Sequence, residues 1–289
     1  MAAGRRWRGA VAVGLLIGLA GTGCAARPAA ASLPDGVTVS VFQNRFDYGA
    51  RALELEIRNG TADPITVTAA SFESTRFASP ADWDRPQVVP DGSARDLKVQ
   101  LPAPRCDGTA PVDTVVIAFT LADGRSGRAT LTPTDEQGRV DAINAEDCLG
   151  VSVAAIAAIT PPDAIRWTPG AHAPAAVDLA VVPTGAAGSF TIRYAKGTVL
   201  LSLVDEASGQ PYDMALDRRV DAQAGASVIP LRVVPARCDA HAVEEDKRGT
   251  FFPLEVETDD GRSGKLYVAV SDEVRRGLYD FYADYCGLP

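Results

Sequence analysis

Apolar and polar residues alternate along much of this chain with a period of two, which is typical of half-buried β-strands. Leu53, Leu55 and Ile57 alternate with charged residues, and the Asn59-Gly60 pair that follows is a turn signal. The same alternation recurs in residues 65–69, 190–194 and 199–203. The pattern predicts a mainly β protein built from short strands.

Two Asp-Gly pairs mark further turns. Asp123-Gly124 follows the β-rich run 115–121, and Asp260-Gly261 precedes the run 266–270. Asp-Gly between strands favours a tight hairpin, because glycine adopts the left-handed backbone that such a turn requires. We therefore expect a β-hairpin at each pair.

Before Cys286, the last cysteine, apolar residues recur at helical spacing instead of alternating. The apolar positions near helical spacing are Val274, Leu278, Phe281 and Tyr285. Ser271 or Asp272 is suited to cap the first turn. Val140 and Ile143 hold the matching places ahead of Cys148, so a short helix is expected before each of these two cysteines.

Three landmarks occur twice in the same order, which indicates an internal repeat. They are Arg-Cys-Asp at 105–107 and 237–239, Asp-Gly-Arg-Ser-Gly at 123–127 and 260–264, and a cysteine beside Leu and Gly at 148–150 and 286–288. The final cysteine follows the last glycine of the second landmark by 21 positions in one copy and 22 in the other. Such constant spacing favours duplication over coincidence.

The repeat predicts two domains, at residues 33–149 and 150–289. Both copies are expected to begin alike, with Gly-Val-Thr-Val-Ser at 36–40 matching Gly-Val-Ser-Val-Ala at 150–154. Short strands with regular turn signals favour a sandwich. The predicted fold is two tandem immunoglobulin-like β-sandwich domains from an internal duplication, each with a short helix before its last cysteine.

Residues 1–23 have the three parts of a signal peptide: a cationic start, an apolar run at 10–20, and small residues ahead of Cys24. The apolar run is shorter than the roughly 20 residues that a spanning helix needs. The stretch resembles the bacterial lipoprotein signal, in which this cysteine is lipidated and becomes the mature N-terminus. It departs from that pattern at Gly21, where the family prefers leucine.

The resemblance implies a protein anchored to the outer face of the cell membrane through Cys24. Residues 24–32 then form a short tether to the first domain. The alternative is soluble secretion, with cleavage after the alanines at 29–31.

The acidic composition of the chain bears on which classes of partner it can bind. The net charge of −9 includes Arg5, Arg6 and Arg8, and their removal leaves 25 cationic against 37 acidic side chains, or −12. Phosphate backbones repel such a surface, which excludes nucleic acid as the expected partner. The Ala-, Arg- and Asp-rich composition resembles secreted or lipid-anchored proteins of actinobacteria, a resemblance that implies no particular activity.

Four cysteines remain once Cys24 is set aside, and an exported chain exposes them to an oxidising compartment. Because the duplication assigns two to each copy, we expect the bonds Cys106–Cys148 and Cys238–Cys286. Each closed loop stabilises the fold by about 4 kcal/mol in the chain-entropy account. No Cys-x-x-Cys pair is present, so a zinc site is the weaker use of these residues.

The best candidate for other chemistry is the loop after the second Arg-Cys-Asp. Its potential metal ligands are Asp239, His241, Glu244 and Glu245. The competing interpretation is a solvated loop or short helical turn with surface ion pairs, because no two of these residues have a recognised ligand spacing. The other histidine, His172, lies in a Pro- and Gly-rich loop.

No catalytic constellation stands out. The chain has no Gly-x-Ser-x-Gly, and no pair of carboxylates is singled out as acid and base. Trp83 and Trp167 lie in Pro-containing connections and are expected to cover sandwich edges.

We therefore expect a non-catalytic envelope protein without a cofactor, which binds or scaffolds an envelope protein or cell-wall component. The alternatives are a cell-wall-directed hydrolase with an acidic site, and a metal-binding lipoprotein.

Overall fold

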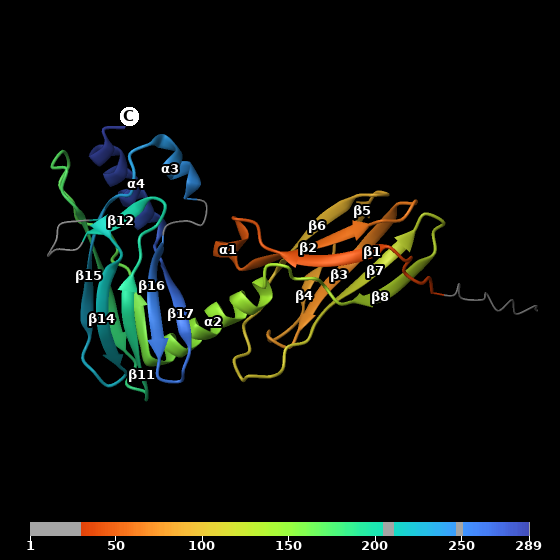
Figure 1. Cartoon of the computed structure of the whole chain (residues 1–289), viewed down its shortest axis with the longest axis horizontal. Coiled ribbons are helices and arrows are strands. Elements are labelled where there is room, and N and C mark those ends of the chain that lie inside the picture. Colours follow the sequence, from red (N-terminus) through yellow and green to blue (C-terminus); the bar gives the residue numbers. More distant parts are fainter. Residues whose placement is uncertain (1–29, 205–210, 247–250, 289) are drawn as a thin grey trace, which may run out of the picture.

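The computed structural model describes residues 30–204, 211–246 and 251–288. Within them the chain is mainly β, with several antiparallel sheets arranged around two separate apolar cores (Figure 1). The first core uses residues between Ala31 and Ile143, and the second uses residues between Leu149 and Tyr282. Each core lies between two sheets, so we call the two units the N-terminal and C-terminal sandwiches.

The N-terminal sandwich combines a small and a larger sheet. The small sheet has the order β1 (Val37–Phe42), β2 (Ala52–Asn59), β6 (Ala94–Gln100). The larger sheet has the order β4 (Ala81–Trp83), β3 (Ile65–Ser74), β7 (Asp113–Leu121), β8 (Ser126–Leu131), and β5 (Gln87–Val89) also pairs with β3. The four-residue helix α1 (Asp47–Ala50) connects β1 to β2.

The C-terminal sandwich is built in the same way. One sheet has the order β13 (Pro211–Tyr212), β12 (Leu201–Val204), β15 (Ser227–Pro235), β10 (Ala175–Pro183), β9 (Ala157–Thr160). The other has the order β14 (Met214–Asp221), β11 (Ser189–Ala195), β16 (Phe251–Thr258), β17 (Ser263–Ala269). Helices α3 (Ala240–Glu245) and α4 (Asp272–Cys286) complete the unit.

The central strands of the two sandwiches have the same order. β1-β2-β6 corresponds to β9-β10-β15, and β3-β7-β8 corresponds to β11-β16-β17. A register shift follows Val67 in β3 and Ile192 in β11. The partners at those points, Phe119 and Val256, each lie five residues before the glycine of a hairpin. The two halves therefore share strand connectivity and an irregularity at the same place.

Both predicted hairpins are confirmed, but the predicted alternation holds only in part, because Tyr194 and Val199, which it grouped with buried residues, are 41% and 51% exposed. Leu53, Leu55 and Ile57 are fully buried. The turns of the β7–β8 and β16–β17 hairpins contain Gly124 and Gly261, which have φ angles of +84° and +87°. Glycine is suited to this left-handed backbone because it has no Cβ.

Asn59 turns the chain from one sheet to the other, since β2 and β3 belong to different sheets. Its buried side chain donates hydrogen bonds to the carbonyls of Asp63 and Val89, at 2.9 and 3.1 Å, and so fixes the turn.

The helix before Cys286 is α4, capped by the Ser271 hydroxyl as expected. The helix around Cys148 differs from the prediction of a short helix. It is α2 (Arg139–Ile156), which continues eight residues past the cysteine and includes residues 150–154, which were expected to match residues 36–40 at the start of the first copy. The first strand of the C-terminal sandwich, β9, begins only at Ala157.

Two apolar stripes explain the length of α2. Val140 and Ile143 pack into the N-terminal core, whereas Leu149, Val153 and Ile156 pack into the C-terminal core. The spacing of the second stripe is four and three residues, the period of a helix face rather than of a strand. The expected division between residues 149 and 150 falls inside this helix (Figure 1).

The signal peptide at 1–23 and Cys24 lie outside the described residues. The end of the predicted tether packs against the N-terminal sandwich, because Ala31 is buried and its amide donates to the Ser126 carbonyl at 2.9 Å. A Cβ on Gly127 would lie 2.1 Å from the Ala31 carbonyl oxygen, so glycine makes this close approach possible. In the described parts of the chain, the helices are all too short or too polar to cross a membrane.

Candidate functional site

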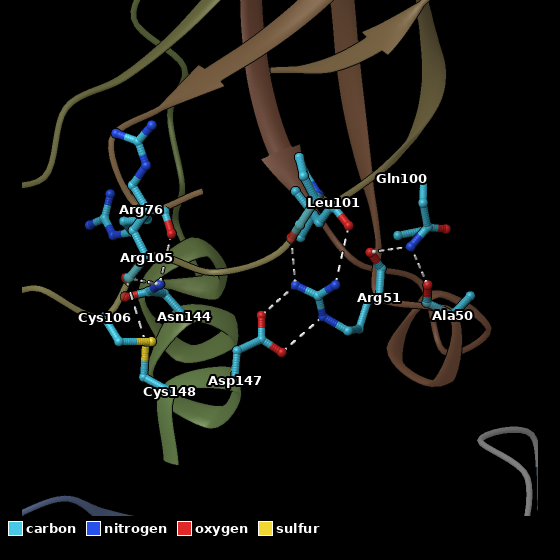
Figure 2. Close-up of polar contacts among 12 residues, drawn as sticks. Ala50, Arg51, Arg76, Gln100, Leu101, Arg105, Cys106, Asn144, Asp147 and Cys148 are labelled. Atoms are coloured by element: carbon cyan, nitrogen blue, oxygen red, sulfur yellow. Dashed lines mark hydrogen bonds and ion pairs between the residues drawn. A yellow bond between two sulfur atoms is a disulfide. The ribbon is translucent and has the colours of Figure 1, made fainter. Parts of the chain in front are cut away.

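Helix α2 is attached to the N-terminal sandwich by a charged clamp (Figure 2). The Arg51 guanidinium donates to both carboxylate oxygens of Asp147, at 2.8 and 2.5 Å. It also donates to the carbonyl oxygens of Leu101 and Pro102, at 3.2 and 2.9 Å. A bidentate pair of this kind fixes orientation as well as distance, so the helix cannot rotate freely against the sheet.

A disulfide and an amide lie beside this clamp. Cys106 and Cys148 are bonded, and Asn144, one helical turn earlier, donates to the carbonyls of Arg76 and Arg105 at 3.0 and 3.2 Å (Figure 2). The first turn of α2 through Cys148 is therefore fixed to the loops that surround the Arg-Cys-Asp segment.

The C-terminal sandwich also has a disulfide beside a hydrogen-bonding helical side chain, which is Tyr282 in place of Asn144. Cys238 and Cys286 are bonded, and Tyr282, again four residues before the helical cysteine, is fully buried. Its hydroxyl donates to the Arg237 carbonyl at 2.6 Å, which is the counterpart of the Arg105 carbonyl bound by Asn144.

A groove lies between the two sandwiches, with α2 contributing to one side. It consists of two adjoining cavities of about 540 and 320 Å³, a size typical of ligand sites. Both cavities are lined by Tyr48, Phe251, Lys265 and Tyr267. One also reaches Arg45 and Lys196, and the other reaches Arg51 and Asp147. We call this the inter-sandwich groove.

The wall from the N-terminal sandwich is α1 and the residues around it. Asp47 is fully buried and accepts a hydrogen bond from the Asn44 amide at 2.6 Å, while the Lys98 ammonium lies 2.6 Å from its other oxygen. The Tyr48 ring lies 4.6 Å from the Arg139 guanidinium carbon of α2. These contacts place the Tyr48 ring in the groove.

Glu54 lies beside Asp47 and shares Lys98 with it at 3.3 Å. Burial, and then the charge of Asp47, raise the pKa of Glu54, while Lys98 opposes the shift. The folded state therefore favours protonated Glu54, and this contribution to stability is lost as the pH rises.

The opposite wall comes from β16 and β17. The rings of Phe251 and Tyr267 meet edge to face with centroids 5.0 Å apart. Lys196 lies at the rim, where a hydrogen bond to Asp213 is the main reason that its pKa is raised. The same contact lowers the pKa of Asp213.

Some charged side chains that line the groove form ion pairs, and others do not. Asp147 pairs with Arg51, and Glu245 pairs with Arg237. Arg45 and Lys265 are exposed and have no ion pair or side-chain hydrogen bond within the described residues. The groove therefore combines aromatic surface with two cations available to a ligand.

The predicted cysteine pairing is confirmed: Cys106 bonds Cys148 and Cys238 bonds Cys286, with Cα–Cα distances of 5.5 and 5.3 Å. Disulfides of this kind are typical of proteins that fold outside the cytoplasm. The repeated sequence landmarks thus predicted the two disulfides, but none of them pointed to the groove.

The candidate metal loop does not form a metal site. Asp239 caps α3, because its carboxylate accepts the amides of His241 and Ala242 at 3.0 and 3.1 Å. Asp239 and Glu245 also pair with Arg237. No group of three potential ligands, with or without Glu244, converges anywhere in the described residues, which favours the competing interpretation. The residues form a short capped helix with surface ion pairs.

The remaining candidates have structural roles. The Trp167 ring packs against Phe281 with centroids 5.7 Å apart, and Trp83 packs against the N-terminal core. His172 contacts the end of α4, where its Nδ1 lies 3.0 Å from the Tyr285 carbonyl oxygen. Both tryptophans therefore pack against a core, although Trp83 ends strand β4 instead of lying in a connection, and His172 is a loop residue in contact with a helix.

Comparison with known proteins identifies no family. No family model matches the chain, and no curated protein matches it. Among solved structures it is similar to a red sea bream transglutaminase, with 13% identity, a TM-score of 0.26, and coverage of 82% of this chain and 31% of that one. The chain thus spans about a third of that enzyme.

Two further structures are similar over most of their length. The B domain of a biofilm associated protein has 9% identity and a TM-score of 0.24, with coverage of 86% of this chain and 88% of that one. A chaperone–tip adhesion subunit complex from Acinetobacter baumannii pili has 9% identity and a TM-score of 0.22, covering 81% and 100%. Scores this low carry no argument about fold or function.

Proposed function

We propose that this protein is a non-catalytic binding module that acts outside the cytoplasmic membrane and holds a partner protein in the inter-sandwich groove. In this proposal the module consists of two immunoglobulin-like domains, at residues 33–149 and 150–289, that arose by duplication. Lipidated Cys24 anchors it to the outer face of the membrane after removal of residues 1–23.

Three independent correspondences support the duplication. The strand orders agree, the register shifts in β3 and β11 lie at the same distance from a hairpin, and each helical cysteine is preceded at four residues by a side chain bound to the Arg-Cys-Asp segment. Chance does not readily reproduce an irregularity and a tertiary contact together.

The groove is the observation that carries the binding proposal. Partner-binding surfaces are enriched in aromatic and arginine side chains, and the groove presents Tyr48, Phe251 and Tyr267 with Arg45 and Lys265. Its walls belong to different sandwiches that share α2 and touch directly, since Arg262 donates to the Cys106 carbonyl at 3.0 Å. Such a scaffold holds the two walls at a fixed separation, which reduces the entropy lost on binding.

The binding proposal is tested by co-purification from the native envelope with tagged wild-type and variant proteins. Tyr48→Ser and Tyr267→Ser should each reduce recovery of the partner at least tenfold, because truncation of a central aromatic anchor costs about 2 kcal/mol or more. The matched control is Tyr194→Ser, an exposed tyrosine on β11 outside the groove. Equal recovery with all three variants would contradict the proposal.

Anchoring is tested separately by fractionation. Cys24→Ala should move the protein from the membrane fraction to the soluble exported fraction, because the lipid is its only proposed attachment. If the wild-type protein is already soluble and begins at Ser32, the lipoprotein proposal is wrong and the secretion alternative holds.

A further inference from the structure

The groove borders an open sheet edge. Within the described residues β17 is the last strand of its sheet and pairs with β16 alone, while α2 packs against its Gly264 end through Leu149. The Thr258 amide donates to the Arg262 carbonyl on the β17 side, whereas the Pro253 carbonyl accepts from Lys196 on the β11 side. Because backbone groups alternate along a strand, the even-numbered residues of β16 bond to β17.

This alternation fixes which groups of β17 face outward. Leu266 and Val268 lie opposite Leu254 and Phe252 and use their backbone groups within the sheet. The backbone N–H and C=O groups of Lys265 and Ala269 therefore point to the outer edge, and both residues line the groove. An edge of this kind is a template for one more strand.

The side chains at the same place favour an acidic strand. Lys265 is exposed at this edge, and Arg45 lies on the other side of the groove. Neither has an ion pair within the described residues, whereas Asp147 and Glu245 are paired with arginines. Lys265 lies opposite Glu255 of β16 on one side, and an acidic residue on an added strand would place a second carboxylate on its other side.

We propose that the partner enters the groove as an extended acidic segment that adds to the Lys265–Ala269 edge of β17, with its carboxylates on Lys265 and Arg45. This inference rests on the proposed function and names the chemistry of its partner. Main-chain hydrogen bonds supply affinity in this mode, and alternate side chains supply specificity.

The test uses synthetic peptides and the full exported chain. The probe is a fluorescent ten-residue peptide of alternating valine and glutamate, and its counterpart replaces glutamate with lysine. Two further versions carry N-methyl groups on one or the other alternate set of amides, which removes the donors of one strand edge at a time. Sodium polygalacturonate provides an acidic chain without a peptide backbone.

We expect the glutamate peptide to bind and the lysine peptide to bind at least tenfold more weakly. One N-methylated version should lose binding and the other should retain it, since only one edge of an added strand faces β17. Lys265→Glu and Arg45→Glu should each weaken binding at least tenfold. The control is Arg128→Glu, an exposed and unpaired arginine at the matching position of β8, which should stay within twofold.

Three results would overturn the inference: equal binding of both N-methylated peptides, equal binding of the lysine peptide, or Lys265-dependent binding of polygalacturonate in place of the peptide. If no peptide binds while partner recovery still depends on Tyr48 and Tyr267, the acidic-strand inference fails and the proposed function stands. If recovery is also independent of both tyrosines, both fail.

Discussion

Tyr282 and Asn144 perform one task with different chemistry. Each lies four residues before a helical cysteine, and each binds the carbonyl of the arginine in an Arg-Cys-Asp segment. Tyr282 does more, because its hydroxyl also accepts the Asp239 amide at 3.1 Å and is fully buried. The repeat of cysteines predicted the disulfides, but no pattern in the sequence related a tyrosine to an asparagine.

Tyr282→Phe should lower the free energy of unfolding of the C-terminal sandwich by about 1–3 kcal/mol, because it removes the hydroxyl's hydrogen bonds to the backbone of Arg237 and Asp239. Tyr279→Phe, a tyrosine on the same helix whose hydroxyl donates to Asp246, is the control and should cost less, since it is only partly buried. Denaturant unfolding measures both. A Tyr282→Phe protein as stable as wild type would contradict the assigned role.

Glu54 makes stability depend on pH through a raised pKa, caused first by burial and then by Asp47. A group whose pKa is higher in the folded state stabilises the fold when protonated and loses that contribution as the pH rises through the folded pKa. Glu54→Gln should therefore gain stability relative to wild type as the pH rises from 4 to 7. The charge-matched control is Glu73→Gln, an exposed residue on β3.

Chemical denaturation at a series of pH values measures this difference. The account is wrong if Glu54→Gln and Glu73→Gln change with pH in the same way, or if the stability of Glu54→Gln relative to wild type falls as the pH rises.

At the scale of elements, the sequence of α2 fits both a strand period and a helix period. Val151 and Val153 satisfy the strand period, yet Val151 is 52% exposed while Val153 is buried, because both belong to a helix. The helix period of Leu149, Val153 and Ile156 overrides the local alternation once there is a second core to pack against. The hairpins were predictable because Asp-Gly turns depend on local chemistry alone.

The contact between Ala31 and Gly127 gives a prediction at the scale of elements. Gly127→Ala should destabilise the N-terminal sandwich by about 1–3 kcal/mol, because the new methyl would overlap both the Ala31 carbonyl and the Phe119 ring. Gly150→Ala is the contrasting variant: its Cβ meets nothing within 4 Å, and alanine in a helix interior should stabilise by up to about 1 kcal/mol. Thermal unfolding distinguishes them, and equal effects would contradict the docking of residue 31.

The whole molecule has two cores but one shared helix. The mainly β character and both disulfides followed from patterns in the sequence. The inter-sandwich groove did not, because its walls come from residues about 200 positions apart, Tyr48 and Tyr267 among them, and depend on how α2 sets one sandwich against the other.

Because the two cores are separate, loss of one disulfide should destabilise only the sandwich that contains it. Removing the second disulfide with Cys238→Ser and Cys286→Ser should destabilise the C-terminal sandwich by about 4 kcal/mol, the chain-entropy value for a loop with a separation of 48 residues. The N-terminal core should keep its amide protection in hydrogen exchange. Simultaneous loss of protection in both cores would show that the two sandwiches unfold as a single unit.

The groove is tested most directly by hydrogen–deuterium exchange of the exported chain, alone and saturated with the protein that co-purifies with it. We predict slowed exchange at the β17 edge, residues 265–269, and around α1, residues 45–51, with no change in β8 at the matching position of the N-terminal sandwich. Protection that lies elsewhere and leaves both walls of the groove unchanged would contradict the account.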